Sequence, residues 1–135
     1  KSQPGTSWRI CRVLATQMRS MEAEAHDLHL AYVSHLSHIT SFALSKAVLK
    51  KEEDERHIFD MAGSGFASTV RLAKSSPEMW APIFKHNKEN LLDGLSTYIK
   101  ELEAFKALLA ALDEEGMKDF MAEANKIRAL VDKIS

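Results

Sequence analysis

Residues 91–131 read LLDGLSTYIKELEAFKALLAALDEEGMKDFMAEANKIRALV and contain the most regular apolar pattern of the chain. In the first part, apolar residues recur at alternating steps of four and three: Leu91, Leu95, Tyr98, Leu102, Phe105, Leu109 and Leu112. After Gly116 a second set follows the same rule: Met117, Phe120, Ala124, Ile127 and Val131. Such steps place residues on one face of an α-helix. The stretch therefore predicts an antiparallel helical hairpin with its turn at residues 113–116.

Helical spacing also extends through the preceding residues. Apolar residues recur every three or four positions over residues 8–25, and residues 26–51 are apolar around much of the helix, as in a helix buried among others. The charged run KKEEDER, residues 50–56, indicates a solvated turn or a helix start. With only 5 glycines and 3 prolines and few alternating strand patterns, the chain is predicted to be all-α, a helical bundle ending in the long hairpin.

Two short signals divide the middle of the chain. Gly63-Ser64-Gly65 predicts a break, because glycine permits backbone angles that other residues avoid. Residues 66–74 resume helical spacing. Ser76 before Pro77 then has the form of an N-cap followed by proline at the first helical position.

Composition narrows the possible partners and locations. The chain has 135 residues, enough for one domain with its own core, and its net charge of -1 argues against a nucleic-acid partner. Cys11 is the single cysteine, which excludes an internal disulfide and fits a reducing cytoplasm. No apolar run approaches the ~20 residues that span a bilayer, so no membrane partner is expected. The start at Lys1 without Met favours an excised piece of a longer protein.

Four of the six histidines lie in HDLHLAYVSHLSH, residues 26–38. His35 and His38 are three apart and share one face of a helix. Imidazoles can donate to or accept from an anionic organic substrate. The competing interpretation is that they only satisfy local hydrogen bonds, and we keep it for His29. A zinc site would need a third protein ligand, and a metal-dependent phosphohydrolase with a His-Asp pair would need a histidine before His26. No metal is therefore expected.

A second group of candidates lies in GSGFASTVRLAKSSPEMW, residues 63–80. A dinucleotide loop is rejected because position 68 is serine and no apolar strand leads into the glycines. Arg71 emerges from an apolar helical segment, where a guanidinium can form a bidentate pair with a carboxylate. A surface arginine or a structural ion pair is the alternative. Trp80, taken alone, indicates a core or interface residue.

Taken together, these groups resemble the signature of the prephenate dehydrogenase family in order and spacing. The matching residues are His26-Asp27, Ser34-His35-Leu36-Ser37-His38, Gly65-Phe66, Arg71, Ser76-Pro77-Glu78-Met79-Trp80, Asn87 and Asn90. The resemblance covers residues 14 to about 100, and the hairpin agrees in pattern.

The resemblance implies NAD(P)-dependent oxidative decarboxylation of prephenate to 4-hydroxyphenylpyruvate in tyrosine biosynthesis, with arogenate as substrate in some members. An N-terminal nucleotide-binding domain holds NAD or NADP and supplies the catalytic histidine, and a helical C-terminal domain forms an intertwined homodimer. Residues 26–135 would be that dimerisation and substrate domain. Residues 1–25 would be a lead-in and the remnant of the nucleotide-binding domain. This chain alone would bind no cofactor and be inactive.

By position, the resemblance assigns a substrate carboxylate to Arg71 and a place in the same pocket wall to His38. Trp80 would lie near the site at the dimer interface, and Gly65 would be a loop glycine that permits close approach. The other motif histidines would brace the pocket: His26 and His35. We expect the arginine and the histidine pair to converge on a water-poor hollow between helices.

Two positions depart from the family pattern. Ser37 replaces the usual proline, which restores a backbone donor and should straighten the helix. Ser68 stands where many members have aspartate, so a polar contact across the dimer is weakened and tyrosine as a feedback effector is doubtful. The rival functions are a non-enzymatic helical dimerisation module and a metal-dependent hydrolase. The preferences for prephenate or arogenate, and for NAD or NADP, are not decided by the sequence.

Overall fold

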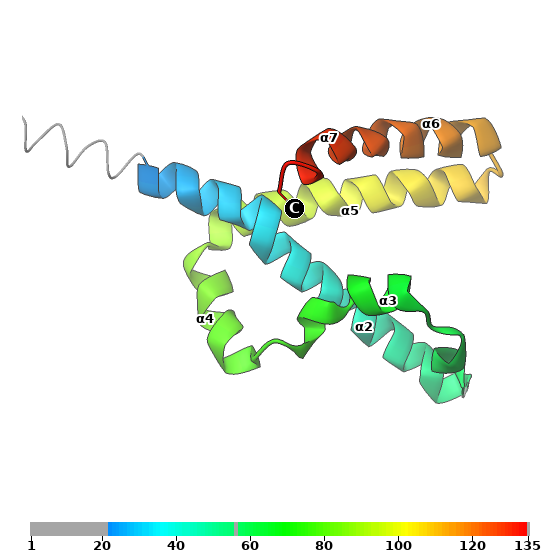
Figure 1. Cartoon of the computed structure of the whole chain (residues 1–135), viewed down its shortest axis with the longest axis horizontal. Coiled ribbons are helices and arrows are strands. Elements are labelled where there is room, and N and C mark those ends of the chain that lie inside the picture. The colour runs from blue at the N-terminus through cyan, green and yellow to red at the C-terminus, as the bar shows by residue number, and fades with distance from the viewer. Residues whose placement is uncertain (1–21, 56, 135) are drawn as a thin grey trace, which may run out of the picture. The chain divides into compact units, whose positions relative to one another are not determined.

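The computed structural model describes residues 22–55 and 57–134 (Figure 1). The apolar pattern predicted over residues 8–21, including Cys11, lies outside these residues. Every regular element in the described ranges is a helix and none is a strand, which confirms the all-α fold class. No helix in this part of the chain has the length and apolar character needed to cross a membrane.

The chain forms two units that meet within one long helix, at Gly94 and Leu95. The first unit contains helical residues 22–30, the π-helix η1 (Ala31–His35), α2 (Leu36–Asp54), the short 3₁₀ helix η2 (Ile58–Met61), α3 (Ser64–Thr69), the 3₁₀ helix η3 (Arg71–Lys74), α4 (Pro77–His86) and the start of α5 (Lys88–Ala110). The second contains the rest of α5, α6 (Glu114–Ala124), η4 (Asn125–Ile127) and α7 (Arg128–Val131).

The first unit is built on a helix in which every residue from 22 to 54 is helical. One π-turn interrupts its regular hydrogen bonding, and the N–H of Leu36 donates to the carbonyl of Ala31, five residues back. The predicted turn at residues 50–56 is wrong for residues 50–54, which form the last turn of α2. Lysine and glutamate are good helix formers, so an exposed charged run extends a helix as readily as it ends one.

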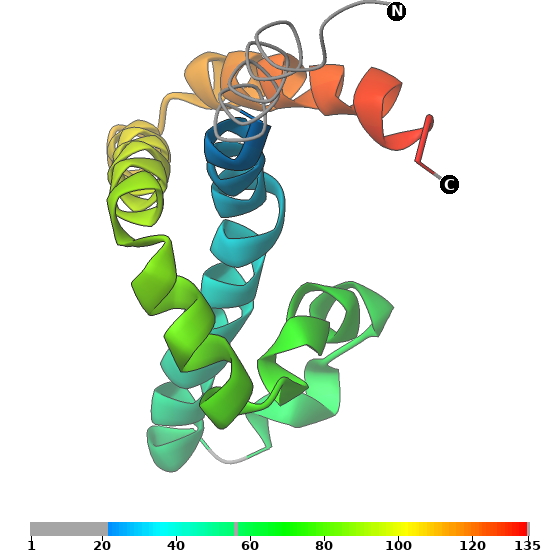
Figure 2. The same ribbon diagram turned by 90° about the vertical axis from the view of Figure 1, so that its left-hand side faces the viewer.

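The segment from η2 to η3 folds back along α2 (Figure 2). The buried hydroxyl of Ser41 donates to the carbonyl of Thr69 at 2.6 Å and fastens the end of α3 to α2. The break predicted at the glycines lies at residues 62–63, between η2 and α3. Neither glycine adopts an unusual angle, because Gly63 has φ -116° and Gly65 is helical. The left-handed residue of this reversal is His57, with φ 72°.

The start of α4 confirms the predicted cap. The hydroxyl of Ser76 accepts a hydrogen bond from the N–H of Met79 at 3.3 Å, and Pro77 occupies the first helical turn. Because proline lacks an N–H, it fits a position where no helical partner exists for that donor. This cap fixes where α4 begins, and with it the position of Trp80 one turn later.

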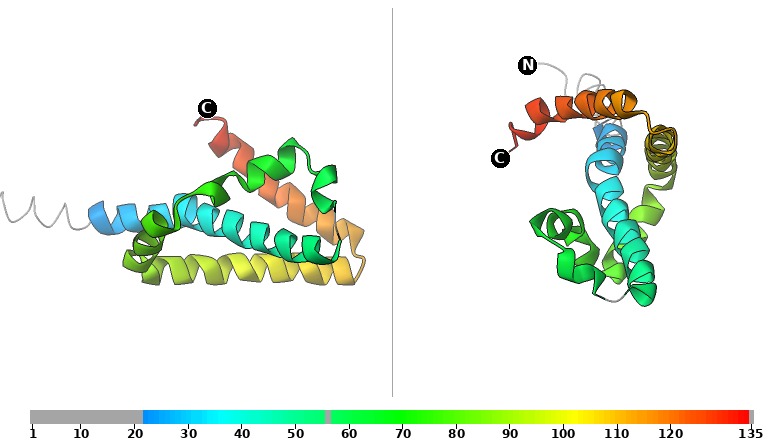
Figure 3. Two further views of the ribbon diagram at one scale, coloured as in Figure 1. Left: turned by 90° about the horizontal axis from the view of Figure 1, so that it is seen from below. Right: turned by 90° about the vertical axis from the view of Figure 1, so that its right-hand side faces the viewer.

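The second unit contains the predicted helical hairpin (Figure 3). Its turn lies at residues 111–113 rather than at 113–116, because residues 114–116 form the first turn of α6. Phe105 of α5 and Phe120 of α6 meet edge to face with centroids 5.3 Å apart. At the end of α5, Asp113 N–H donates to the Leu108 carbonyl and Leu112 N–H to the Leu109 carbonyl, the two bonds of a Schellman motif. Leu112 therefore has φ 53° and is 81% exposed, so it is not part of the apolar stripe.

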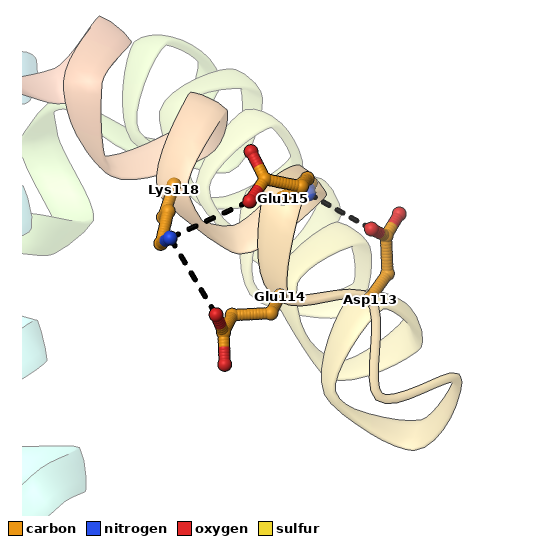
Figure 4. Close-up of polar contacts among 5 residues, drawn as sticks. Asp113, Glu114, Glu115 and Lys118 are labelled. Atoms are coloured by element: carbon orange, nitrogen blue, oxygen red, sulfur yellow. Dashed lines mark hydrogen bonds and ion pairs between the residues drawn. The ribbon is translucent and has the colours of Figure 1, made fainter.

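The first turn of α6 is capped by a carboxylate (Figure 4). Asp113 accepts from the N–H of Gly116 at 2.9 Å. Lys118 reaches Glu114 at 3.5 Å and Glu115 at 3.4 Å. Acidic side chains at this end of a helix also interact favourably with its dipole.

Neither helix of the hairpin is covered by its partner alone. Large apolar side chains of the second unit remain exposed on α5, α6 and the segments that follow: Ile99, Leu102, Leu109, Met121, Ile127, Leu130, Val131 and Ile134. Two helices can bury only the faces that they turn toward each other. A further covering surface is needed for the others.

We predict that Asp113→Ala lowers the free energy of unfolding by about 1 kcal/mol, because it removes the N-cap of α6. Urea unfolding followed by circular dichroism measures this change. Asp113→Asn should retain most of the stability, because its amide oxygen can still accept from Gly116. Asp119→Ala removes the same charge from the body of α6 and serves as the control. Equal losses for the two alanine variants would contradict the role of the cap.

Candidate functional site

Two histidines and two aromatic residues gather where the first long helix meets α4. The ring of His38 stacks on Trp80 with centroids 3.7 Å apart and planes 26° from parallel. His35 meets Trp80 edge-on at 6.0 Å and Phe84 at 6.1 Å. The ring centroids of Trp80 and Phe84, one turn apart on α4, are 5.6 Å apart. We call these four residues the imidazole–indole cluster.

The π-turn of the first helix ends at His35, within the cluster. A π-turn inserts one extra residue and changes the direction in which the following side chains point; such turns are frequent at functional sites. Ala31, at its start, is fully buried, and His35 is only 6% exposed. The spacing of His35 and His38 then brings both rings to the same tryptophan, as predicted from their separation of three residues.

Asn87, directly after α4, ties this cluster to the start of the first helix. Its amide Nδ2 donates to the carbonyl of Asp27 at 2.7 Å and lies 3.2 Å from Nδ1 of His35. Its Oδ1 accepts from Nδ2 of Asn90 at 3.0 Å. Asn87 is buried, so all of these partners are needed to offset its desolvation.

His38 is held by its own helix. Its Nδ1 lies 2.9 Å from the carbonyl of Ser34, one turn back, and the carbonyl can only accept. The face of Trp80 lies against the same ring. The Ser34 carbonyl and the Trp80 indole therefore fix the orientation of the His38 ring.

Burial lowers the pKa of His35 below its ordinary value of 6.5. The positive charge available to neighbouring His38 lowers it further, and the carboxylate of Asp27 acts in the opposite direction. Desolvation is the largest cause because the charged form loses water that the surrounding rings do not replace. His35 is therefore neutral at physiological pH.

The other predicted site residues do not join this cluster within the described chain. Arg71 is the first residue of η3 and is exposed, and its guanidinium has no hydrogen bond or ion pair with any described residue. His26 is also exposed. An added Cβ at Gly65 would meet no described atom within 4 Å, so nothing in this chain requires a glycine there. The hollow expected between Arg71 and the histidine pair stays a prediction.

No group of three or more histidine, cysteine, aspartate or glutamate side chains among residues 22–55 and 57–134 could hold a metal ion. Two surface hollows lie away from the cluster. One is apolar, between the end of α2 and α3, and includes Val48, Phe59 and Phe66. The other is polar and includes Glu24, Asp27 and Asn90.

Sequence reasoning missed the roles of Asn87 and Phe84. The pair of asparagines in HNKEN carries part of the family resemblance, but one sequence does not reveal which asparagine is buried. Phe84 had the spacing to reach the same face as Trp80, because the two residues are four apart on α4. The sequence did not show which helix this face of α4 packs against.

Comparison with known proteins gives a family for the chain. Residues 22–132 match the model of the prephenate dehydrogenase dimerization domain. The chain is 30% identical over 108 residues to the prephenate dehydrogenase of Bacillus subtilis, covering 80% of this chain and 29% of that protein.

Two solved structures are similar in fold. One is the prephenate dehydrogenase of A. aeolicus in complex with hydroxyphenyl propionate and NAD+, at a TM-score of 0.72 and 34% identity, covering 80% of this chain and 38% of that one. The other is Synechocystis arogenate dehydrogenase, at a TM-score of 0.67 and 26% identity, covering 82% of this chain and 40% of that one. The chain thus spans less than half the length of these relatives.

The lowered pKa of His35 makes stability depend on pH. Above 6.5 the ring is neutral in both states, and its contribution to stability is fully present. As the pH falls through 6.5 toward the pKa in the folded chain, the unfolded chain binds more protons and stability is lost. We predict that urea unfolding shows this loss in the wild type and a smaller one in His35→Gln. The exposed His29→Gln should behave like the wild type; an unchanged slope in His35→Gln would overturn the assignment.

Proposed function

The chain belongs to the prephenate dehydrogenase dimerization-domain family, and we propose that it forms the dimerising, substrate-binding part of an NAD(P)-dependent enzyme that oxidatively decarboxylates prephenate. The family match over residues 22–132 is the observation that carries this proposal. A cytoplasmic location is part of it, consistent with Cys11 as the single cysteine.

The exposed apolar residues of the hairpin support a homodimer. Leu102 and Leu109 of α5 are 53% and 54% exposed, and Leu130 of α7 is 60% exposed. Burying such side chains stabilises an assembly by about 25 cal/mol for each Å² removed from water. A second copy of the same hairpin offers an apolar surface of the same kind.

The positive charge of Arg71 supports prephenate as the proposed substrate. Prephenate carries two carboxylates, and a bound dianion needs cationic or N–H partners to replace its water. The guanidinium of Arg71 forms no hydrogen bond or ion pair with any described residue. We assign it to one carboxylate. His35, His38 and Trp80 form an aromatic wall, and we propose that it lies against the substrate's ring. Gly65 and His26 complete the proposed site.

The cofactor belongs to another part of such an enzyme. A dinucleotide site needs a strand, a glycine loop and a helix in sequence, and the described residues contain no strand. The nicotinamide would supply the hydride acceptor. The residues of this chain would bind the dianion, orient its ring and exclude water. In this proposal, residues 1–25 are a lead-in and the remnant of the end of the nucleotide-binding domain, and the chain alone does not reduce NAD.

Specific observations favour an alternative substrate and an alternative function. Similarity to Synechocystis arogenate dehydrogenase favours arogenate as a second candidate substrate. The exposed hairpin by itself is also consistent with a helical dimerisation module without enzymatic function. Dimerisation does not distinguish this module from the proposed function, whereas substrate binding does.

We predict that the chain is a dimer in solution and that Leu109→Glu shifts it toward the monomer, because a charge cannot be buried in an apolar interface without cost. Sedimentation equilibrium measures the change. Leu109→Met keeps the side chain apolar and is the matched control. A wild-type chain that stays monomeric at high concentration would refute the dimer.

We predict that Arg71→Ala weakens binding of prephenate, or of hydroxyphenyl propionate as a stable carboxylate probe, by about 2 to 5 kcal/mol for a desolvated pair. Isothermal titration calorimetry measures the affinity. Arg128→Ala removes an equal charge from α7 in the second unit and should bind like the wild type. Equal affinities of wild type and Arg71→Ala would remove Arg71 from this role. No binding of either ligand by the wild-type dimer would favour the non-enzymatic module.

A further inference from the structure

The two histidines of the cluster use the same ring atom, Nδ1, but their partners have opposite requirements. Nδ1 of His35 faces the amide nitrogen of Asn87 at 3.2 Å. Nδ1 of His38 faces the carbonyl oxygen of Ser34 at 2.9 Å. An amide nitrogen can only donate and a carbonyl oxygen can only accept. One ring must therefore carry no proton at Nδ1, and the other must carry one.

The orientation of the Asn87 amide is fixed from both ends. Its nitrogen lies 2.7 Å from the carbonyl of Asp27, which requires an N–H donor. Its oxygen lies 3.0 Å from the amide nitrogen of Asn90, which requires an acceptor. Turning the amide over would place two acceptors together and two donors together. The second N–H of Asn87 is thus directed to His35.

The remaining nitrogen of each ring is available for other partners. Within residues 22–55 and 57–134, no buried side-chain nitrogen or oxygen lacks a hydrogen-bond partner. The Nε2 atoms of His35 and His38 have no such partner among these residues. They are therefore reached by solvent and can meet a ligand, although His35 as a whole is 94% covered, with 6% of its surface exposed.

We infer that Asn87 is a positioning residue, which holds His35 as the neutral tautomer with its proton on Nε2, while the Ser34 carbonyl holds His38 with its proton on Nδ1. His35 then presents a fixed N–H donor. His38 presents a lone pair when neutral and a second N–H when charged. The two rings, both in contact with Trp80, therefore offer complementary groups at their Nε2 atoms.

The two rings also differ in what protonation does to them. Charging His35 would place a second N–H against the donor of Asn87 and break that bond. Charging His38 keeps its bond to Ser34 and adds an attraction to the face of Trp80. Asp27 and His38 on its own helix are the charged groups whose fields shift the pKa of His35. The residues of α4 that face its ring are Trp80 and Phe84, which carry no charge. Protonation would therefore break the contact of His35 with Asn87 and leave the contact of His38 with Ser34 in place.

Long-range proton–nitrogen NMR of the labelled wild-type chain, recorded well above the ordinary imidazole pKa of about 6.5, tests the tautomers directly. We expect a protonated-type shift at Nε2 and an unprotonated-type shift at Nδ1 for His35, and the reverse for His38. His35→Gln and His38→Gln assign the signals. Averaged nitrogen shifts for His35, as in a freely exchanging imidazole, would overturn the inference without any further variant.

Asn87→Asp tests the positioning role, because a carboxylate of the same shape accepts where the amide donates. We expect the Nδ1 of His35 to become protonated and the midpoint of its titration to move to higher pH, with the tautomer of His38 unchanged. Asn125→Asp makes the same charge change on η4 in the second unit and should alter neither ring. An unchanged His35 pattern in a folded Asn87→Asp chain would overturn the role.

The identity of the ligand that accepts from His35 rests on the proposed function, whereas the tautomer of His35 does not. A substrate carboxylate or carbonyl oxygen would accept from Nε2 of His35. The experiments can therefore contradict the substrate site and the positioning role of Asn87 independently. Correct tautomers without binding of hydroxyphenyl propionate would count against the substrate site alone. Binding with averaged His35 tautomers would count against the positioning role alone.

Discussion

The buried amide of Asn87 is the contact on which the first unit most depends. It joins the residue after α4 to the first turns of the long helix, through Asp27 and His35, and Asn90 of α5 supports it from the other side. A buried amide is costly unless each of its polar atoms has a partner. This requirement admits one relative position of α4 and the long helix. Trp80 and Phe84 are carried to the histidines as a consequence.

Around this amide, the polar and aromatic contacts make one arrangement. The π-turn brings His35 to the buried side of the helix, and α4 supplies the rings that exclude water from it. The same exclusion lowers the pKa of His35. Packing, protonation and hydrogen-bond direction are therefore set together, by a few residues on two helices. Preorganised donors of this kind are what binding of a charged ligand requires.

The second unit follows a different principle. Its two helices are joined by a Schellman motif and a capped first turn, both local features of the backbone. Its apolar faces exceed what the hairpin can cover. Membership of a dimerization-domain family gives this excess a reason: the unit's core is proposed to be completed by a second copy.

Periodicity predicted the helices of the hairpin and the N-cap at Ser76 because both depend on residues close in sequence. It failed at Leu112, where the need to satisfy the last carbonyls of α5 outweighed the apolar repeat. It also predicted the break at Gly63, although glycine allows unusual angles without requiring them and Gly63 has none. The convergence of Arg71 with the histidines stays a prediction, because its guanidinium forms no hydrogen bond or ion pair with any described residue.

The sequence by itself determined the helical class, the hairpin and the motif that carries the family resemblance, since spacing along a helix decides which residues share a face. Only the tertiary structure decided that Asn87 is buried, that Trp80 stacks on His38, and which ring nitrogen of each histidine is left open. These depend on contacts between segments about 40 to 60 residues apart. No local pattern records such contacts, because they arise when helices pack and polar groups must find partners away from water.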